Sequence, residues 1–338
     1  MKITKILVAL SFLFAVSTAN AGELTVTGNM EATYHSQSDT QTGNPLGMDR
    51  ELKFAGSTEL DNGMTVSVMQ DTSDNLGYGN SQVAFGNVMG IATIYVGSDS
   101  DPVDAIDDIT PSAYEEAWGS GSGTLNDIGD LAGQMGIGAK FDLPILGSVN
   151  AKYYPKVDST KNADNASSGG VNHGVGSGES ITLKTDLGAI PFTNGIFDGA
   201  TLTTGYSSQE NQLAPNTADA MDLTAAINYS IGSFKLGIQQ KYHNEGEATQ
   251  GAEVTSYRDM AYGVVYAVND ELSISFNRYD SSRQQASVVD KEQSTDAINI
   301  GYTVGGMTIG FQEASTDNAG WVTNAKDDTR TLGVSVAF

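Results

Sequence analysis

Apolar and polar residues alternate with a period of two along most of the chain. In residues 24–34 the apolar side chains occupy one set of alternate positions, and the positions between them are polar. The same alternation recurs at 221–229 and at 332–338. Successive side chains of a β-strand point to opposite faces of a sheet, so this pattern indicates strands with one apolar face and one polar face.

Sixteen such segments are predicted, and the connections between them alternate between long and short. The strands are predicted at 24–35, 48–60, 64–71, 81–88, 91–98, 134–142, 148–157, 180–187, 200–208, 219–229, 233–243, 257–268, 271–280, 295–304, 307–315 and 328–338. Long connections are predicted at 36–47, 72–80, 99–133, 158–179, 209–218, 244–256, 281–294 and 316–327. Short turns such as 61–63 and 305–306 join the strands at the other end, and 188–199 is a longer turn. Long loops at one end and tight turns at the other are typical of outer-membrane barrels.

The predicted fold class is therefore all-β, an antiparallel transmembrane β-barrel of sixteen strands. The mean hydropathy is only −0.22. A barrel accounts for this low value, because only alternate residues meet lipid while the others line a wet interior. Closure also pairs every backbone hydrogen-bonding group without leaving a free edge. Sixteen strands leave an aqueous lumen, whereas the lumen of eight strands is filled by side chains.

The first residues predict export from the cytoplasm. Lys2 and Lys5 precede an apolar run at 6–16, and a small-x-small sequence follows at 19–21. Residues 1–21 are therefore predicted to be a secretory signal peptide, and 22–338 a single barrel. A retained anchor is the alternative, but the apolar run is too short to span a bilayer as a helix. No later segment reaches the roughly 20 apolar residues that a membrane helix needs, and the absence of cysteine excludes disulfides.

Three segments resemble the trimeric general diffusion porins of Gram-negative bacteria. The chain ends in alternating apolar residues at 332–338 that close on Phe338, similar to the assembly signal of that family. Residues 51–56 and the turn 61–63 resemble its second strand and first turn, and 82–86 with 94–97 resemble its fourth and fifth strands. The resemblance implies a homotrimer in the cell outer membrane, inserted by the barrel assembly machinery. It also implies that the third long loop, 99–133, folds into the lumen as a constriction.

The pore wall departs from the family pattern. Many general porins carry arginines opposite the constriction loop, but the matching positions here are Glu51, Gln82 and Gln134, and an arginine at the end of the fifth strand becomes Ser98. Lys53 and Lys140 are further wall candidates. By register, seven lysines point inward: Lys53, Lys140, Lys152, Lys156, Lys184, Lys235 and Lys241. They are either solvated separately in the lumen, or some of them face the acidic loop and replace the missing arginines.

The predicted constriction loop is strongly acidic. The whole chain has 41 acidic and 17 basic residues, so a nucleic-acid partner is excluded. The residues between Lys53 and Lys140 include no Lys, Arg or His, and the loop contains these acids: Asp99, Asp101, Asp104, Asp107, Asp108, Glu115, Glu116, Asp127 and Asp130. Carboxylates around a narrow aqueous path attract cations and repel anions. The alternatives are an acidic loop solvated at the surface, and a calcium site at Asp99, Asp101 and Asp104.

Four of the five arginines have the parity of the lipid-facing residues and lie toward the long-loop ends of their strands. They are Arg50, Arg258, Arg278 and Arg330, whereas Arg283 is predicted to lie in a loop. Guanidinium groups bind phosphates bidentately. The four are therefore predicted to form a rim that binds lipopolysaccharide phosphates. Twist or bulging at the strand ends, which would leave them in loops or at subunit contacts, is the alternative.

The sequence predicts a water-filled outer-membrane channel for small hydrophilic solutes and ions, with a preference for cations. Catalysis is not expected, because the three histidines lie far apart in the sequence and no nucleophile, base and orienting group can be recognised together. A substrate-selective channel is one alternative, and Tyr95, Tyr154 and Tyr279 are candidate inward tyrosines for it. A structural barrel with little conductance is another. No cofactor is implied apart from the calcium hypothesis.

Overall fold

The computed structural model describes residues 24–37, 44–73, 77–99, 101–117, 128–129, 131–156, 175–191, 195–211, 217–247 and 252–338. They form a closed antiparallel barrel in which each strand pairs with its neighbours in the sequence and β1 pairs with β16, so the predicted fold class is confirmed. The strands are β1 (Leu24–Gln37), β2 (Leu46–Glu59), β3 (Thr65–Ser73), β4 (Gly77–Val88), β5 (Ala92–Gly97), β6 (Gly136–Leu143), β7 (Gly147–Tyr154), β8 (Val175–Asp186), β9 (Ala200–Asn211), β10 (Ala220–Ile231), β11 (Phe234–Asn244), β12 (Thr255–Ala267), β13 (Leu272–Gln285), β14 (Val288–Val304), β15 (Met307–Asp317) and β16 (Lys326–Ala337).

Two short 3₁₀ helices complete the described elements. They are η2 (Asp104–Ile106) and η5 (Ala319–Trp321). Within the described ranges, no helix has the length and apolar character needed to cross a membrane. The predicted signal peptide, Asp127, Asp130 and His173 all lie outside the described residues.

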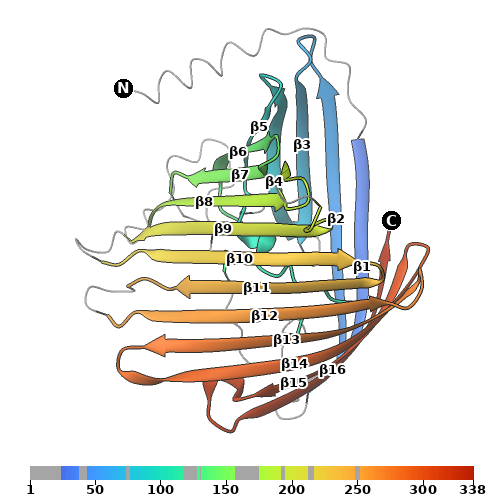
Figure 1. Ribbon diagram of the computed structural model, residues 1–338. Helices are drawn as coiled ribbons and strands as arrows, with labels where there is room; N and C mark the ends of the chain where they lie inside the picture. Colours follow the sequence, from blue (N-terminus) through green and yellow to red (C-terminus); the bar gives the residue numbers. More distant parts are fainter. Residues whose placement is uncertain are drawn as a thin grey trace.

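The barrel closes where the first strand meets the last (Figure 1). The backbone N–H of Gly28 donates to the carbonyl of Phe338 at 2.9 Å, and the N–H of Phe338 donates to the carbonyl of Gly28 at 3.0 Å. The closing register then continues from Asn29 opposite Ala337 up to Gln37 opposite Thr329. Closure leaves no unpaired sheet edge, which a strand surrounded by lipid requires.

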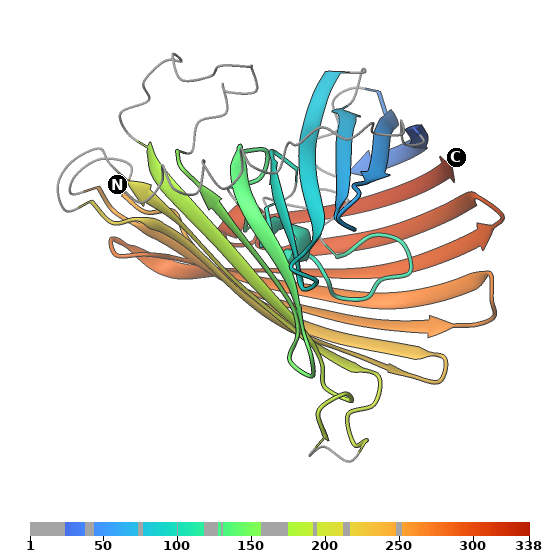
Figure 2. The ribbon, with the colours of Figure 1, turned by 90° about the horizontal axis from the view of Figure 1, so that it is seen from above.

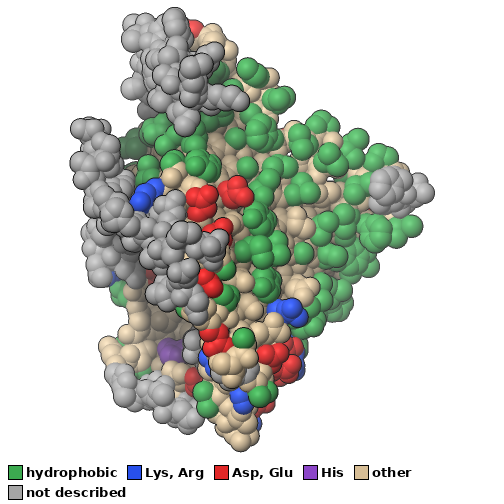
Figure 3. All heavy atoms as spheres, turned by 90° about the vertical axis from the view of Figure 1, so that its left-hand side faces the viewer, with side chains coloured by type: hydrophobic (Ala, Val, Ile, Leu, Met, Phe, Trp, Pro, Cys, Tyr) green, Lys and Arg blue, Asp and Glu red, His purple; other side chains and the backbone are tan. Residues whose placement is uncertain are grey.

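The alternation of the sequence becomes an apolar exterior and a polar interior. On β12, Tyr262, Val264 and Tyr266 are exposed on the outer face, whereas the intervening Ala261 and Val265 are buried. Inward polar residues such as Asn277 and Gln312 are fully buried inside the barrel. Figure 3 shows hydrophobic side chains over the upper and right-hand parts of one face, with acidic and basic side chains beside one another in its lower part.

Several strands extend further toward the long-loop end than the sequence predicts. The predicted long loop at 281–294 is wrong: β13 continues to Gln285, β14 begins at Val288, and only two residues separate them. Arg283 is therefore a strand residue, paired with Tyr257 on β12 and Lys291 on β14. Beyond the membrane both faces of a strand meet water, so the period-two pattern fades while the backbone pairing continues.

Candidate functional site: the loop inside the barrel

The connection between β5 and β6, residues 98–135, is called the inner loop below, and its described residues lie along the inner wall of the barrel. Figure 2 shows its segment around η2 inside the ring of strands. Its described residues contact the wall first at Tyr154 on β7, then at Gln239 on β11 and Asn277 on β13, and finally at Glu31 on β1. The loop thus follows more than half of the strands.

Asp101 anchors the start of this path. Its Oδ1 accepts a hydrogen bond of 2.6 Å from the hydroxyl of Tyr154. Its Oδ2 accepts the backbone N–H groups of Val103 at 2.9 Å and Asp104 at 3.1 Å. Because Asp101 is fully buried and both oxygens are engaged, it holds the loop in place and does not face the lumen. Among the described residues, Asp99, Asp101 and Asp104 do not assemble into a metal-binding group.

Buried amide side chains on the wall bind the backbone of the loop. Oε1 of Gln239 accepts the N–H of Ile109 at 3.0 Å, while its Nε2 donates to the carbonyl of Ile106 at 2.7 Å. On the neighbouring strand, Nδ2 of Asn228 donates to the carbonyl of Ile109 at 2.9 Å. The backbone N–H and C=O of Ile109 are therefore both satisfied by the wall, as buried backbone requires.

The same arrangement continues toward the end of the path. Nδ2 of Asn277 donates to the carbonyl of Pro111 at 3.0 Å. Nε2 of Gln312 donates to the carbonyls of Glu115 at 3.1 Å and Glu116 at 2.7 Å. These contacts fix the backbone of the two glutamates against β15.

Glycines let the loop lie close to the wall. The ring of Tyr114 lies directly on Gly310 of β15, and its hydroxyl lies against Gly333 of β16, where a Cβ atom would overlap it. The hydroxyl then donates a hydrogen bond of 2.7 Å to Oε1 of Glu31 on β1. Other inward glycines lie beneath the loop at positions 205, 237, 263 and 301. This row of glycines is not predicted from the sequence, although they fall on alternate, inward positions of their strands.

Gly129, where the loop returns toward β6, lies beside a buried aspartate–histidine pair. Oδ1 of Asp222 lies 2.6 Å from Nδ1 of His243, and both side chains are buried. Oδ2 of Asp222 accepts the backbone N–H of Gly129 at 3.0 Å and the hydroxyl of Ser207 at 2.8 Å. Leu131 follows Gly129 and packs against Tyr154. The pair is not predicted from the sequence, because Asp222 and His243 are far apart in it and meet only through the pairing of β10 with β11.

The remaining acids of the inner loop meet the lumen to different extents. Asp108 is exposed, while Asp104, Asp107, Glu115 and Glu116 are partly buried. Burial raises the pKa of Glu116 to about 7, with further contributions from the negative charges of Asp108 and Glu115. Burial, Glu31 and Asp108 also raise the pKa of Glu115. The charge carried by this end of the loop therefore depends on pH near neutrality.

The predicted wall residues are only partly brought together. Lys53, Gln82 and Asp99 line one hollow of about 280 Å³. Nε2 of Gln82 lies 3.4 Å from Oδ2 of Asp99. Glu51 shares the inward face of β2 with Lys53, opposite Asn29 on β1. The prediction that Gln134 lies on a strand is wrong, since β6 begins at Gly136.

Six of the seven predicted lysines lie on inward strand positions, whereas Lys156 falls beyond the end of β7. Lys152 is buried and donates to the carbonyl of Asp99 at 2.9 Å, with its Nζ 4.8 Å from the ring centre of Tyr154. Lys241 is also buried, with its Nζ 5.4 Å from the ring centre of Tyr279. Lys53, Lys140, Lys184 and Lys235 are exposed.

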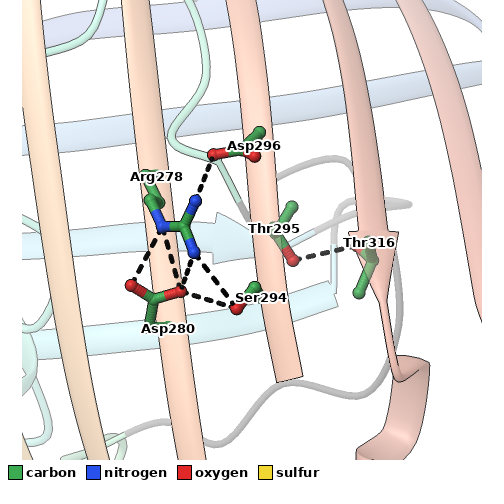
Figure 4. A network of polar contacts seen from close by, with 6 residues as sticks. All are labelled: Arg278, Asp280, Ser294, Thr295, Asp296 and Thr316. Carbon is green, nitrogen blue, oxygen red and sulfur yellow. Dashed lines mark hydrogen bonds and ion pairs between the residues drawn. The ribbon is translucent and has the colours of Figure 1, made fainter. Parts of the chain in front are cut away.

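The four rim arginines occupy outward positions. Arg278 forms ion pairs with Asp280 at 2.9 Å and Asp296 at 3.4 Å, and Ser294 joins the network (Figure 4). Arg330 forms an ion pair with Glu313 at 2.7 Å. Arg50 and Arg258 share this outward parity, opposite Met30 and Tyr242. In contrast, Arg283 lies with its guanidinium 5.4 Å from the ring centre of Trp321.

A closed sixteen-stranded barrel with an apolar exterior, a polar interior and a long loop inside defines a membrane channel protein. The Gram-negative porin family matches residues 7–338 of the sequence. The chain therefore belongs to the Gram-negative porins, which form diffusion channels in the outer membrane. None of the curated proteins matches the sequence.

Solved structures with the same fold include several porins. OmpT, an outer membrane protein of Vibrio cholerae, superposes with a TM-score of 0.69 at 10% identity, covering 96% of this chain and 100% of that one. An anion-selective porin from Comamonas acidovorans has a TM-score of 0.64 at 14% identity, with coverage of 94% and 100%. Salmonella typhi OmpF, in complex with daunomycin, has a TM-score of 0.63 at 14% identity, with coverage of 94% and 98%. At these identities the similarity establishes the fold alone.

Proposed function

We propose that this porin passes small hydrophilic solutes and ions by passive diffusion and prefers cations. The observation that carries the proposal is the course of the inner loop, which holds Asp104, Asp107, Asp108, Glu115 and Glu116 inside the barrel. Carboxylates in a water-filled passage raise the local cation concentration and oppose the entry of anions. No chemical reaction and no cofactor is part of the proposal.

The lysines of the lumen oppose this effect only in part. Lys152 and Lys241 are buried against aromatic rings, so they are less available to a passing ion than the exposed lysines. Lys53 shares its hollow with Asp99. The unbalanced charge that a permeating ion meets at the inner loop is therefore negative.

The test is the reversal potential of single channels in a KCl gradient at pH 8. A variant with Asn or Gln at the five acids of the loop should lose most of the cation preference of the wild type. A matched control replaces Asp61, Asp270 and Glu271, which are exposed at the short-turn end, and should keep the preference. An unchanged reversal potential in the five-site variant would place these acids outside the permeation path. The effect should also shrink at 1 M salt, where the Debye length is about 3 Å.

A substrate-selective channel with an aromatic track is a weaker proposal. Tyr95, Tyr154 and Tyr279 all point inward, but each is at most 1% exposed. Their rings contact lysines, and Tyr154 also contacts the inner loop, so they offer no surface to a solute. A purely structural barrel is distinguished from a channel by the conductance measurement itself.

We also propose a homotrimer, assembled by the barrel assembly machinery. Vibrio cholerae OmpT is described in a trimer form. In this chain the outer face of the first two strands presents Leu24, Tyr34, Leu46 and Met48, each more than half exposed. A second copy would cover these apolar side chains. Cross-linking of the purified protein tests the proposal, and a single band of monomer mass would contradict it.

The outward arginines support a proposed contact with lipopolysaccharide. Arg258 lies at a hollow of about 540 Å³ that also includes Lys291, Asn318 and Thr323. The acids Asp290 and Glu292, both in the described part of the chain, line the same hollow but form no ion pair with Arg258. Because Arg278 and Arg330 already pair with carboxylates, a phosphate must compete for them, so Arg258 is a stronger candidate than either. The phosphate groups of lipopolysaccharide match the fork of donors that arginine presents.

A further inference from the structure

A cavity of about 830 Å³ lies between the inner loop and the wall formed by β5 to β9. Pro102, Ala105 and Ile106 of the inner loop line one side of it. Gly90 and Pro144, from the short turns after β4 and β6, line it as well. The cavity therefore occupies the short-turn side of the inner loop, and its lining includes none of the five acids that carry the proposed cation preference.

Three charged side chains on the wall of this cavity lie close together in the sheet. Lys140 and Asp142 are on the same face of β6, so their Cα atoms are roughly 7 Å apart. Asp142 is opposite Ser148 on β7, and Ser148 is opposite Lys184 on β8. Two strand spacings place the Cα atoms of Asp142 and Lys184 roughly 10 Å apart. Side chains of this length can converge on one small molecule.

The three charges are available to a ligand. Lys140, Asp142 and Lys184 are exposed within the barrel. Among the described residues none of the three takes part in an ion pair or side-chain hydrogen bond, and Lys140 has a single ring contact, 5.5 Å from the centre of Tyr95. Charged groups left without partners in a recess bind a complementary charge more strongly than the same groups on an open surface.

The uncharged lining combines polar groups of the wall with apolar groups, which come from the inner loop and also from Ile91, Ala92, Pro144 and Val149. Hydroxyl and amide groups of the wall lie between the charges, namely Thr93, Ser148, Asn150, Thr182 and Thr203. The inner loop contributes the ring of Pro102 and the aliphatic side chains of Ala105 and Ile106 on the opposite side. A fitting ligand therefore has a polar, charged end and an apolar end.

We propose that this cavity binds zwitterionic α-amino acids with apolar side chains, with the carboxylate between Lys140 and Lys184 and the ammonium group on Asp142. A simple anion would leave Asp142 facing its negative charge, and a simple cation would face two lysines. The apolar side chain lies against Ala105 and Ile106. A zwitterion has no net charge, so the acidic inner loop does not exclude it. This inference rests on the proposed diffusion function and specifies a solute class for the same channel.

The inference is tested with L-leucine as the probe, in single-channel recordings of the full-length protein. Leucine should reduce the ion current in a saturable way. The two half-molecules, 4-methylpentanoate and 3-methylbutylamine, should each need at least ten-fold higher concentrations. Replacing Lys140 and Lys184 with Gln should raise the half-blocking leucine concentration at least ten-fold. Lys235→Gln, which removes an inward lysine outside the cavity, should leave it unchanged.

Asp142→Asn gives a second, independent readout. It should weaken the response to leucine while strengthening the response to 4-methylpentanoate, because the repulsion of a carboxylate disappears. The inference is overturned if normal channels show no saturable response to leucine, or if the lysine variants respond like the wild type. Conductance and cation preference are recorded in the same membrane before leucine is added, so failure of the proposed function is seen separately.

Discussion

The hydroxyl of Tyr114 donates a hydrogen bond of 2.7 Å to Oε1 of Glu31 and thereby joins the inner loop to the first strand of the barrel. The ring lies on Gly310 and its hydroxyl against Gly333, on the last two strands. One side chain of the loop thus contacts strands from both ends of the chain, beside the point where the barrel closes. Movement of the loop and strength of the closure are consequently coupled.

Tyr114→Phe should loosen the end of the inner loop without removing the ring from its place. The loss of a hydrogen bond to a carboxylate costs about 1.5–3 kcal/mol. The expected result is a higher frequency of brief current fluctuations, together with a small decrease in the temperature at which the folded barrel unfolds on heat-modifiability gels. Tyr262→Phe, on the outer face, is the matched control. Equal current noise in wild type and both variants would contradict the prediction.

Cation preference should depend on pH near neutrality. The pKa of Glu116 is raised to about 7, mainly by burial, so this carboxyl is mostly charged at pH 8.5 and mostly neutral at pH 5.5. Lowering the pH over this interval should therefore reduce the cation preference measured by reversal potential. Because the folded pKa is above the ordinary value, protonation favours the folded state, and its contribution to stability is lost as pH rises through about 7.

Two variants identify the group responsible for this change of cation preference with pH. Glu116→Gln should remove the change in selectivity near pH 7. Asp108→Asn should move it to lower pH, because the charge of Asp108 helps to raise the pKa of Glu116. If the Glu116 variant kept the same change of cation preference near pH 7, another group would be titrating.

Asp222→Asn should destabilise the barrel more than the loss of a single neutral hydrogen bond. The carboxylate accepts hydrogen bonds from Ser207 and Gly129 and lies beside His243, all in a buried setting. Hydrogen bonds to charged groups contribute about 1.5–3 kcal/mol each. The free energy of unfolding in urea should fall by about 3 kcal/mol or more, because more than one such bond is weakened, whereas Ser207→Ala, which removes one of them, should cost about 1.5–3 kcal/mol. Equal losses in the two variants would show that the charge contributes nothing.

Arg258→Gln should reduce the lipopolysaccharide that remains bound on purification more than Arg278→Gln does. Arg278 is already shared between Asp280 and Asp296, so its removal mainly leaves two carboxylates on the outer face (Figure 4). The amount of lipopolysaccharide per barrel, measured by phosphate analysis, decides the prediction. A larger loss of lipopolysaccharide from the Arg278 variant would contradict the ranking of Arg258 above Arg278. No loss from either variant would contradict the proposal that these arginines bind lipopolysaccharide.

Alternation of residues allowed the barrel to be predicted from the sequence. Lipid outside and water inside impose opposite requirements on successive residues, so the strand positions and the inward direction of Lys140, Lys184 and Tyr279 follow from parity alone. The same parity placed Arg278 and Arg330 on the outer face. Where the strands leave the membrane this constraint ends, which is why the hairpin around Arg283 was predicted as a loop.

The path of the inner loop was decided only by the tertiary structure. Asp101 and Asp108 are both acids of one loop, yet the first is buried against Tyr154 and the second is exposed in the lumen. Gln239 and Asn277 have the same local pattern as any polar residue of the inner wall, and only the loop lying above them makes them backbone ligands. Periodicity records the environment on either side of a strand, whereas contacts between distant segments depend on distances that a single sequence does not contain.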